Sequence, residues 1–116
     1  MSKLLYKTIA EQIMSDILIE NLEPGSKLKS VREYAIAYSV NPKTIQRAFD
    51  YLDDIKIFHS IVGEGRFLSS EGDVIKQIRI HLIESEVELF ISKMKTYKLP
   101  LEEIESLVKE CYEGNS

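Results

Sequence analysis

The chain has little cysteine, with Cys111 as its single example, so it cannot form an internal disulfide. Such usage is typical of a reducing compartment. No uninterrupted apolar run approaches the ~20 residues that a membrane-spanning helix needs. The N-terminal stretch carries charge at Lys3, Lys7 and Glu11, without the apolar core of a signal peptide between them. We therefore expect a cytoplasmic protein with no membrane partner.

The sequence also lacks the residue groupings that carry chemistry. His81 and Glu84 are three residues apart, but no further His or Cys lies at ligand spacing, so we expect no metal site. No phosphate-binding loop, nucleophile motif or acid–base pair is present. Cys111 follows an apolar helix face, which favours a buried core thiol over a redox switch. The sequence therefore predicts neither a cofactor nor an enzyme.

Charge is distributed unevenly along the 116 residues, of which 44% are hydrophobic and 29% charged. Residues 1–70 contain nine Lys+Arg and nine Asp+Glu, whereas residues 71–116 contain six and ten, so the net charge of −4 lies in the second part. Residues 24–49 carry a local charge of +4. From charge alone, this cluster fits either a solvated basic face or a nucleic-acid surface.

Three helices are predicted in the first part. Apolar residues recur every four positions over residues 5–20, which is typical of an amphipathic helix. Ser30 followed by Glu33 is the capping-box pattern and begins a short helix of about two turns. Asn41-Pro42 then caps a third helix, which we expect to run to about residue 54.

A hairpin and two further helices follow. The β-prone runs 57–62 and 66–68 flank Gly63-Glu64-Gly65, while Lys27-Leu28-Lys29 is too short for more than an isolated bridge. A long helix is expected over residues 73–98, with a last helix after Pro100. The fold class is therefore mostly α: a winged helix-turn-helix with a two-stranded wing over residues 1–70, then a C-terminal two-helix region over residues 71–116.

This order of elements favours DNA recognition. The second helix of a helix-turn-helix enters the major groove with its N-terminal residues facing base edges. Gln46 suits adenine, Lys43 and Arg47 suit guanine, and the methyl group of Thr44 suits thymine. Asn41 and the backbone amides at the helix start are suited to phosphate.

Flanking elements add further candidates. Arg32 lies in the first turn of the preceding helix, where that helix meets the DNA backbone. The wing glycines allow close approach to DNA, and Arg66 follows them at a position suited to phosphate or the minor groove. The predicted DNA-binding residues are Lys29, Ser30, Arg32, Asn41, Lys43, Thr44, Gln46, Arg47, Gly63, Gly65 and Arg66.

Four segments carry a family pattern: 22–28 (LEPGSKL), 30–33 (SVRE), 40–49 (VNPKTIQRAF) and 63–68 (GEGRFL). Together with the first helix they resemble the GntR family of bacterial transcription regulators, in particular its short YtrA-like branch. The resemblance covers essentially the whole chain and implies that the matching residues Arg32, Lys43, Thr44, Gln46, Arg47, Gly63 and Gly65 approach DNA. Three positions depart from the pattern: Lys29 replaces a proline, Lys56 a glycine and Val62 a basic residue.

The resemblance also implies an assembly and a role. In the short branch the two C-terminal helices dimerise, and residues 71–116 are too few for the effector domain of larger members. Independently, residues 73–98 hold more apolar residues than one stripe needs, which predicts a partner surface. We expect a homodimer through the C-terminal helices that binds a pseudo-palindromic operator in double-stranded DNA.

A repressor of a neighbouring operon, often one encoding an ABC-type transporter, is the role that the resemblance implies. The alternative is a winged-helix protein-interaction module without sequence-specific DNA binding, since one fold serves several functions. The operator, the regulated genes and any small-molecule effector are not indicated by the sequence.

Overall fold

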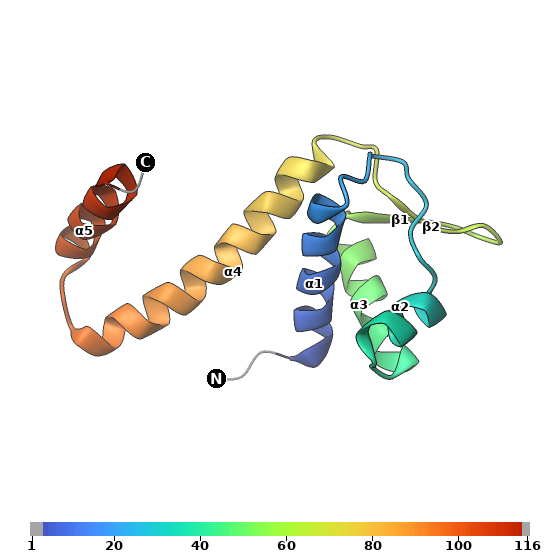
Figure 1. The fold of residues 1–116 in the computed structure, drawn as a ribbon, viewed down its shortest axis with the longest axis horizontal. Helices are drawn as coiled ribbons and strands as arrows, with labels where there is room; N and C mark the ends of the chain where they lie inside the picture. The colour runs from blue at the N-terminus through green and yellow to red at the C-terminus, as the bar shows by residue number, and fades with distance from the viewer. Residues whose placement is uncertain (1–3, 115–116) are drawn as a thin grey trace. The chain divides into compact units, whose positions relative to one another are not determined.

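The computed structural model describes residues 4–114, which form five helices and one two-stranded antiparallel sheet (Figure 1). The elements are α1 (Leu5–Ile19), α2 (Val31–Tyr38), α3 (Pro42–Asp54), β1 (Phe58–Ile61), β2 (Gly65–Leu68), α4 (Val74–Tyr97) and α5 (Leu101–Gly114). This arrangement confirms the predicted mostly α class, with a winged helix-turn-helix followed by two helices. Within residues 4–114, no helix is long and apolar enough to cross a membrane.

Two units make up the chain, one ending at Leu82 and one beginning at Ile83. The division falls inside α4 rather than before it. The first turns of α4 belong to the first unit because Val74 and Ile78 are buried in its core, with 2% and 0% exposure. The assignment of DNA binding to residues 1–70 and dimerisation to residues 71–116 remains a functional prediction.

The core of the first unit is built from apolar residues at helical spacing on α1 and α3. Ile13 and Ile17 on α1, and Ile45 on α3, are completely buried. Phe49 lies edge-on to Tyr34, at 5.7 Å between ring centroids, and to Phe58, at 5.2 Å. Each such side chain contributes about 1.5–3 kcal/mol through burial. The core therefore fixes one face of α3 and leaves the opposite face exposed.

The first three helices end without glycine. Asn21, Ser39 and Lys56 each adopt a left-handed φ, at 54°, 54° and 67°. After α3, the Ile57 N–H donates to the Leu52 carbonyl at 2.9 Å, and the Lys56 N–H donates to the carbonyl of Asp53 at 3.1 Å. These two bonds form a Schellman motif, in which glycine is the usual left-handed residue. The turn therefore closes as a Schellman motif with Lys56 in the position that glycine usually occupies.

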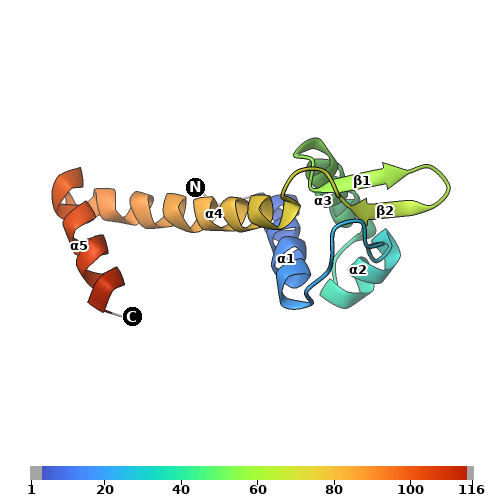
Figure 2. The ribbon, with the colours of Figure 1, turned by 90° about the horizontal axis from the view of Figure 1, so that it is seen from above.

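The wing is the β1–β2 hairpin, which extends from the helical core (Figure 2). Phe58 pairs with Leu68 at its base, and Ile61 pairs with Gly65 next to the turn. Gly63 and Gly65 have φ values of 81° and 113°, which favour glycine because it has no Cβ. The structure confirms the predicted hairpin and places Gly65 within β2. It also confirms the bridge, between Lys27 and Phe67.

The C-terminal helices bury little within their own chain. Val74 and Ile78 are the buried residues of α4, and α5 has none within its described length. Cys111 is exposed, so the expectation of a buried core thiol is wrong for the single chain. The physical reason is that the apolar side of α5 has no core of its own to pack into.

Candidate nucleic-acid interface

The exposed face of α3 is divided by charge. Its exposed polar side chains are Lys43, Gln46, Arg47, Asp50 and Asp54. The basic pair lies in the first two turns, and the two carboxylates lie nearer the C-terminal end. Thr44 is half-buried beside the basic pair. A phosphate backbone is therefore attracted to the N-terminal half of α3 and repelled by its C-terminal half.

The start of α3 satisfies its own backbone amides. The Lys43 N–H donates to the Asn41 side-chain oxygen at 2.8 Å. The Thr44 and Ile45 N–H groups donate to the Asn41 carbonyl at 2.9 and 3.3 Å, and Pro42 has no N–H. These amides are already engaged, so a phosphate contact at this helix start falls to the amino group of the Asn41 side chain.

The start of α2 offers more free donors. Ser30 and Glu33 form the predicted capping box, with the Glu33 N–H donating to the Ser30 hydroxyl at 3.1 Å and the Ser30 N–H donating to Glu33 at 2.9 Å. The backbone hydrogen bond from Ser30 lowers the pKa of the Glu33 carboxyl. Among residues 4–114, the Val31 and Arg32 amides and the Arg32 guanidinium have no acceptor. This helix start is therefore suited to phosphate.

One flank of α3 faces the first turn of α1. The Arg47 guanidinium carbon lies 4.4 Å from the centroid of the Tyr6 ring. Tyr6 packs edge-on against Tyr51 at 6.0 Å, and the Lys7 ammonium lies 5.7 Å from the Tyr51 ring. A cation is attracted to the face of an aromatic ring. This contact holds Arg47 at one edge of the exposed face of α3, where the side chain remains exposed.

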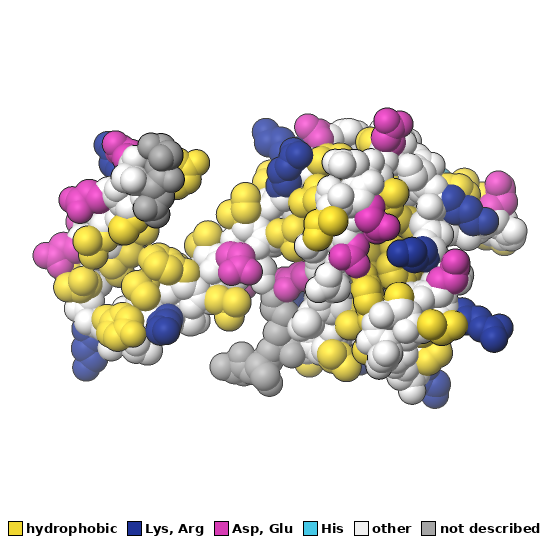
Figure 3. Space-filling view, viewed as in Figure 1, with side chains coloured by type: hydrophobic (Ala, Val, Ile, Leu, Met, Phe, Trp, Pro, Cys, Tyr) yellow, Lys and Arg dark blue, Asp and Glu magenta, His cyan; other side chains and the backbone are white. Residues whose placement is uncertain are grey.

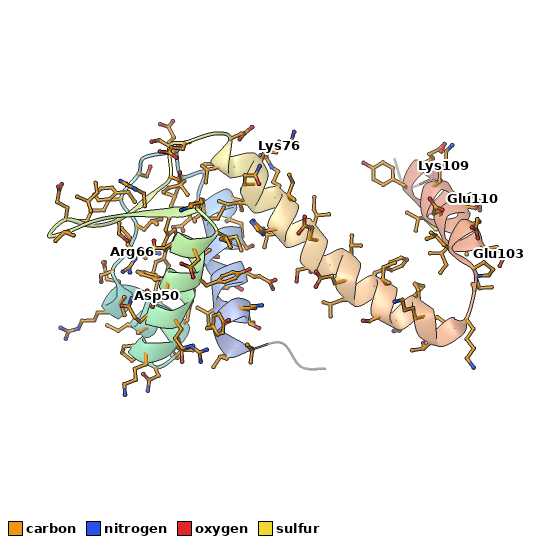
Figure 4. All side chains as sticks on the ribbon, turned by 180° about the vertical axis from the view of Figure 1, so that it is seen from behind. Asp50, Arg66, Lys76, Glu103, Lys109 and Glu110 are labelled. Carbon is orange, nitrogen blue, oxygen red and sulfur yellow. The ribbon has the colours of Figure 1, made fainter. Side chains whose placement is uncertain are left out.

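The other flank faces the wing, where Arg66 is engaged within the protein. Its Nε donates to Asp53 at 3.1 Å, and its Nη2 lies 3.5 Å from Asp50. Its guanidinium carbon also lies 5.0 Å from the Phe49 ring centroid, and the side chain is 22% exposed. Figure 4 shows Arg66 and Asp50 between the wing and α3. The predicted phosphate contact of Arg66 would require these ion pairs to open.

Two carboxylates of this flank were not found by sequence reasoning. Asp50 also accepts from the Gln46 side-chain amide at 2.9 Å, and Asp53 accepts from the Ser60 hydroxyl at 3.1 Å. The four-residue spacing of Gln46 and Asp50 was a readable signal, since such residues are neighbours on a helix. The contacts of Asp50 and Asp53 with Arg66 on β2 had no signal in the sequence.

The remaining predicted residues differ in whether their side chains have partners within the protein. Lys43 has no side-chain partner among the residues that the structure describes, whereas Lys29 lies 3.8 Å from Glu20 and 5.6 Å from the Tyr34 ring centroid. At the wing tip Val62 is fully exposed, at the position where the resemblance leads us to expect a basic residue. Space around Gly63 is open. In the described part of the chain, no group of His, Cys, Asp and Glu is arranged to hold a metal ion.

Comparisons with known proteins agree with this geometry. The pattern that defines the bacterial regulatory proteins of the gntR family matches residues 5–68. The chain is 35% identical over 113 residues to the HTH-type transcriptional regulator YhcF of Bacillus subtilis (strain 168), covering 97% of this chain and 93% of YhcF. It is 26% identical over 107 residues to the HTH-type transcriptional repressor YtrA of the same organism, covering 91% and 82%.

A solved structure extends the likeness to the fold. A GntR family transcriptional regulator from Listeria monocytogenes superposes with a TM-score of 0.72 and 37% identity, covering 94% of this chain and 96% of that one. Members of this family bind DNA to regulate transcription and are not enzymes, which favours the DNA-binding prediction over its protein-interaction alternative. The chain belongs to the gntR family of bacterial regulatory proteins and is a DNA-binding transcription regulator.

Proposed function

We propose that this regulator is a cytoplasmic homodimeric repressor that binds a pseudo-palindromic operator. Each protomer would contact DNA through the exposed face of α3, the start of α2 and the wing. The observation that carries the dimer is the apolar surface of the unit beginning at Ile83. Its exposed large side chains include Ile83, Leu89 and Leu101, at 60%, 63% and 60% exposure. An element of this size does not bury enough surface to be stable alone.

The same unit contains an open apolar groove of about 860 Å³. Its lining residues are Phe90, Met94, Tyr97, Leu99, Ile104, Leu107, Val108, Cys111 and Tyr112. Figure 3 shows hydrophobic side chains over α5 and the adjoining end of α4. Since every copy of the chain carries the same surface, a two-fold pairing covers both grooves at once.

Such a pairing suits a two-fold DNA site. Each protomer contributes one recognition helix, and two of them read half-sites about one helical turn apart. In each half-site, Lys43, Thr44, Gln46 and Arg47 face base edges, while Lys29, Ser30, Arg32 and Asn41 face phosphates. Gly63 and Gly65 allow the wing backbone to approach DNA closely, and Arg66 follows Gly65 on β2. The acidic C-terminal part disfavours non-specific contacts elsewhere on the protein.

Repression is supported by the likeness to YtrA, whose name describes a repressor. A dimer on an operator that overlaps a promoter excludes polymerase from that promoter. The resemblance to the short branch extends this proposal to a neighbouring operon that encodes an ABC-type transporter. A reporter driven by the native promoter tests it, because expression should rise when the regulator is deleted and stay unchanged or fall if the protein is an activator.

Selection of bound sequences from a random duplex pool tests the DNA site. We expect two inverted half-sites with centres about 10–10.5 base pairs apart. Recovery of one unpaired half-site would contradict the dimeric reading mode. Gel-shift titration of Arg32→Ala and Arg47→Ala gives a second check. Unchanged operator affinity in both variants would refute the assignment of α2 and α3 to DNA binding.

Light scattering tests the assembly. We expect about twice the chain mass of 13.4 kDa at micromolar concentration. Leu107→Glu places a charge in the apolar groove and should return the mass to that of one chain, whereas Lys109→Glu on the same helix should leave the dimer intact. A wild-type mass near that of one chain would refute the dimer.

A further inference from the structure

Gln46 is held by a hydrogen-bonded network that reaches from α3 to the wing. Its Nε2 donates to Asp50 Oδ1 at 2.9 Å, and the same oxygen lies 3.5 Å from Arg66 Nη2 on β2. Arg66 is held in turn by Asp53 at 3.1 Å and lies over the Phe49 ring. The Ser60 hydroxyl on β1 donates to the same Asp53 oxygen at 3.1 Å. Both strands of the wing therefore contribute to the network.

The hydrogen bond to Asp50 determines which polar groups of the Gln46 side chain remain available to a base. An ionised carboxylate only accepts hydrogen bonds, so Asp50 selects the orientation of the Gln46 amide in which the amino group faces it. One N–H is used, and Gln46 retains one N–H donor and its carbonyl acceptor. One donor beside one acceptor matches the adenine edge in the major groove, where N7 accepts and N6 donates. A freely rotating amide would also offer its two donors to the acceptors of guanine.

The charges explain why the wing is needed. The Asp50 side chain is 60% exposed, so its carboxylate would repel nearby phosphates if it were unpaired. Arg66 supplies the compensating charge, and its own position is fixed by an ion pair and an aromatic ring. Such charge-assisted contacts are stronger than those between neutral groups. The wing thus acts on the reading face through the protein rather than through DNA.

We propose that Asp50, supported by Arg66, is a positioning residue that fixes the side-chain amide of Gln46 and thereby sets base preference at one operator position. The proposal rests on the proposed function, since it requires that Gln46 read a base. Asp50 does not contact the base in this arrangement. Its effect is confined to the base pair that Gln46 reads.

The test measures discrimination rather than affinity, because removing a carboxylate near DNA strengthens binding to every sequence. The selected operator and its single-base-pair variants are titrated with wild type, Gln46→Ala, Asp50→Ala and Asp50→Asn. We expect Gln46→Ala to reduce discrimination at one symmetric position by a factor on the order of 10. Asp50→Ala should reduce discrimination at that same position, and combining it with Gln46→Ala should add little. Asp50→Asn retains an acceptor oxygen and should recover part of the loss.

Asp54→Ala is the matched control. Asp54 is also an exposed carboxylate of α3, and its side chain has no hydrogen bond or ion pair among residues 4–114. Its removal should raise affinity for all duplexes to a similar degree without altering base preference. If wild type discriminates among the duplexes but Asp50→Ala retains that discrimination or loses it uniformly, the inference is overturned. If wild type itself shows no sequence preference, it is the proposed function that fails.

Discussion

Lys56 occupies the left-handed position that follows α3, and replacing it with glycine should stabilise the protein. Its φ is 67°, and the Lys56 and Ile57 amides complete the Schellman motif with Asp53 and Leu52. Leu52 and Ile57 are 0% and 1% exposed, so the chain must turn here to bury both. The left-handed conformation at Lys56 is therefore imposed by the core and not chosen by the residue.

The size of the effect follows from two opposing terms. A residue with a Cβ is disfavoured in the left-handed region by roughly 1–2 kcal/mol. Glycine removes that penalty but loses about 0.5–1 kcal/mol through the greater freedom of the unfolded chain. Lys56→Gly should therefore raise the free energy of unfolding by about 0.5–1 kcal/mol, which corresponds to roughly 2–5 °C in Tm.

Thermal and denaturant unfolding measure this difference, at one fixed protein concentration because assembly alters apparent stability. Lys56→Ala is the control, since it removes the same charge and side chain but keeps the Cβ. Asn21→Gly repeats the exchange at the end of α1, where asparagine already tolerates the left-handed region, and should gain less. If Lys56→Gly is no more stable than Lys56→Ala, the strain argument is refuted.

Three other perturbations test different parts of the first unit. Ser30→Ala removes the side-chain cap of α2, which accepts a hydrogen bond from the Glu33 N–H. The free energy of unfolding should fall by about 1 kcal/mol in a denaturant titration. An unchanged midpoint would show that the cap is not stabilising. Tyr34 is 2% exposed, and burial raises its pKa to about 12, above the ordinary value near 10. The unfolded chain therefore loses this proton first, and Tyr34 should lower stability by up to about 1.4 kcal/mol per pH unit between about pH 10 and 12. Tyr34→Phe should make the alkaline decline less steep without abolishing it, since burial also raises the pKa of Tyr38; an equally steep decline would exclude Tyr34 as a source. Lys29→Ala should reduce the log–log salt slope of operator binding by up to about 0.9 without changing base preference, so an altered preference would contradict a phosphate role.

The local elements were largely predictable because their determinants lie within a few residues. The capping box joins Ser30 to Glu33, and the α3 cap joins Asn41 to Lys43, so both helix starts follow from adjacent residue types. The hairpin followed from glycines between β-prone runs. Long α4 was predicted as one helix, but its division at Leu82 was not, because hydrophobic spacing does not tell which core an apolar residue joins.

The candidate site was predictable as a set of residue types and not as a set of contacts. Arg66 was assigned to DNA because it is basic and follows the wing glycines, yet its ion-pair partner Asp53 lies 13 residues away in sequence. Arg47 was assigned to a base on the same grounds, and the Tyr6 ring that holds it comes from α1. Cys111 was expected to be buried because its helix face is apolar, although that face has no partner within its own chain.

By itself, the sequence determined the order of helices and strands, the family, and which basic residues are candidates for DNA contact. These depend on caps, periodicity and residue type, which act over one or two turns. Only the tertiary structure decided which of those basic side chains are free and which are engaged within the protein. That outcome depends on carboxylates and rings that folding brings together from distant parts of the chain.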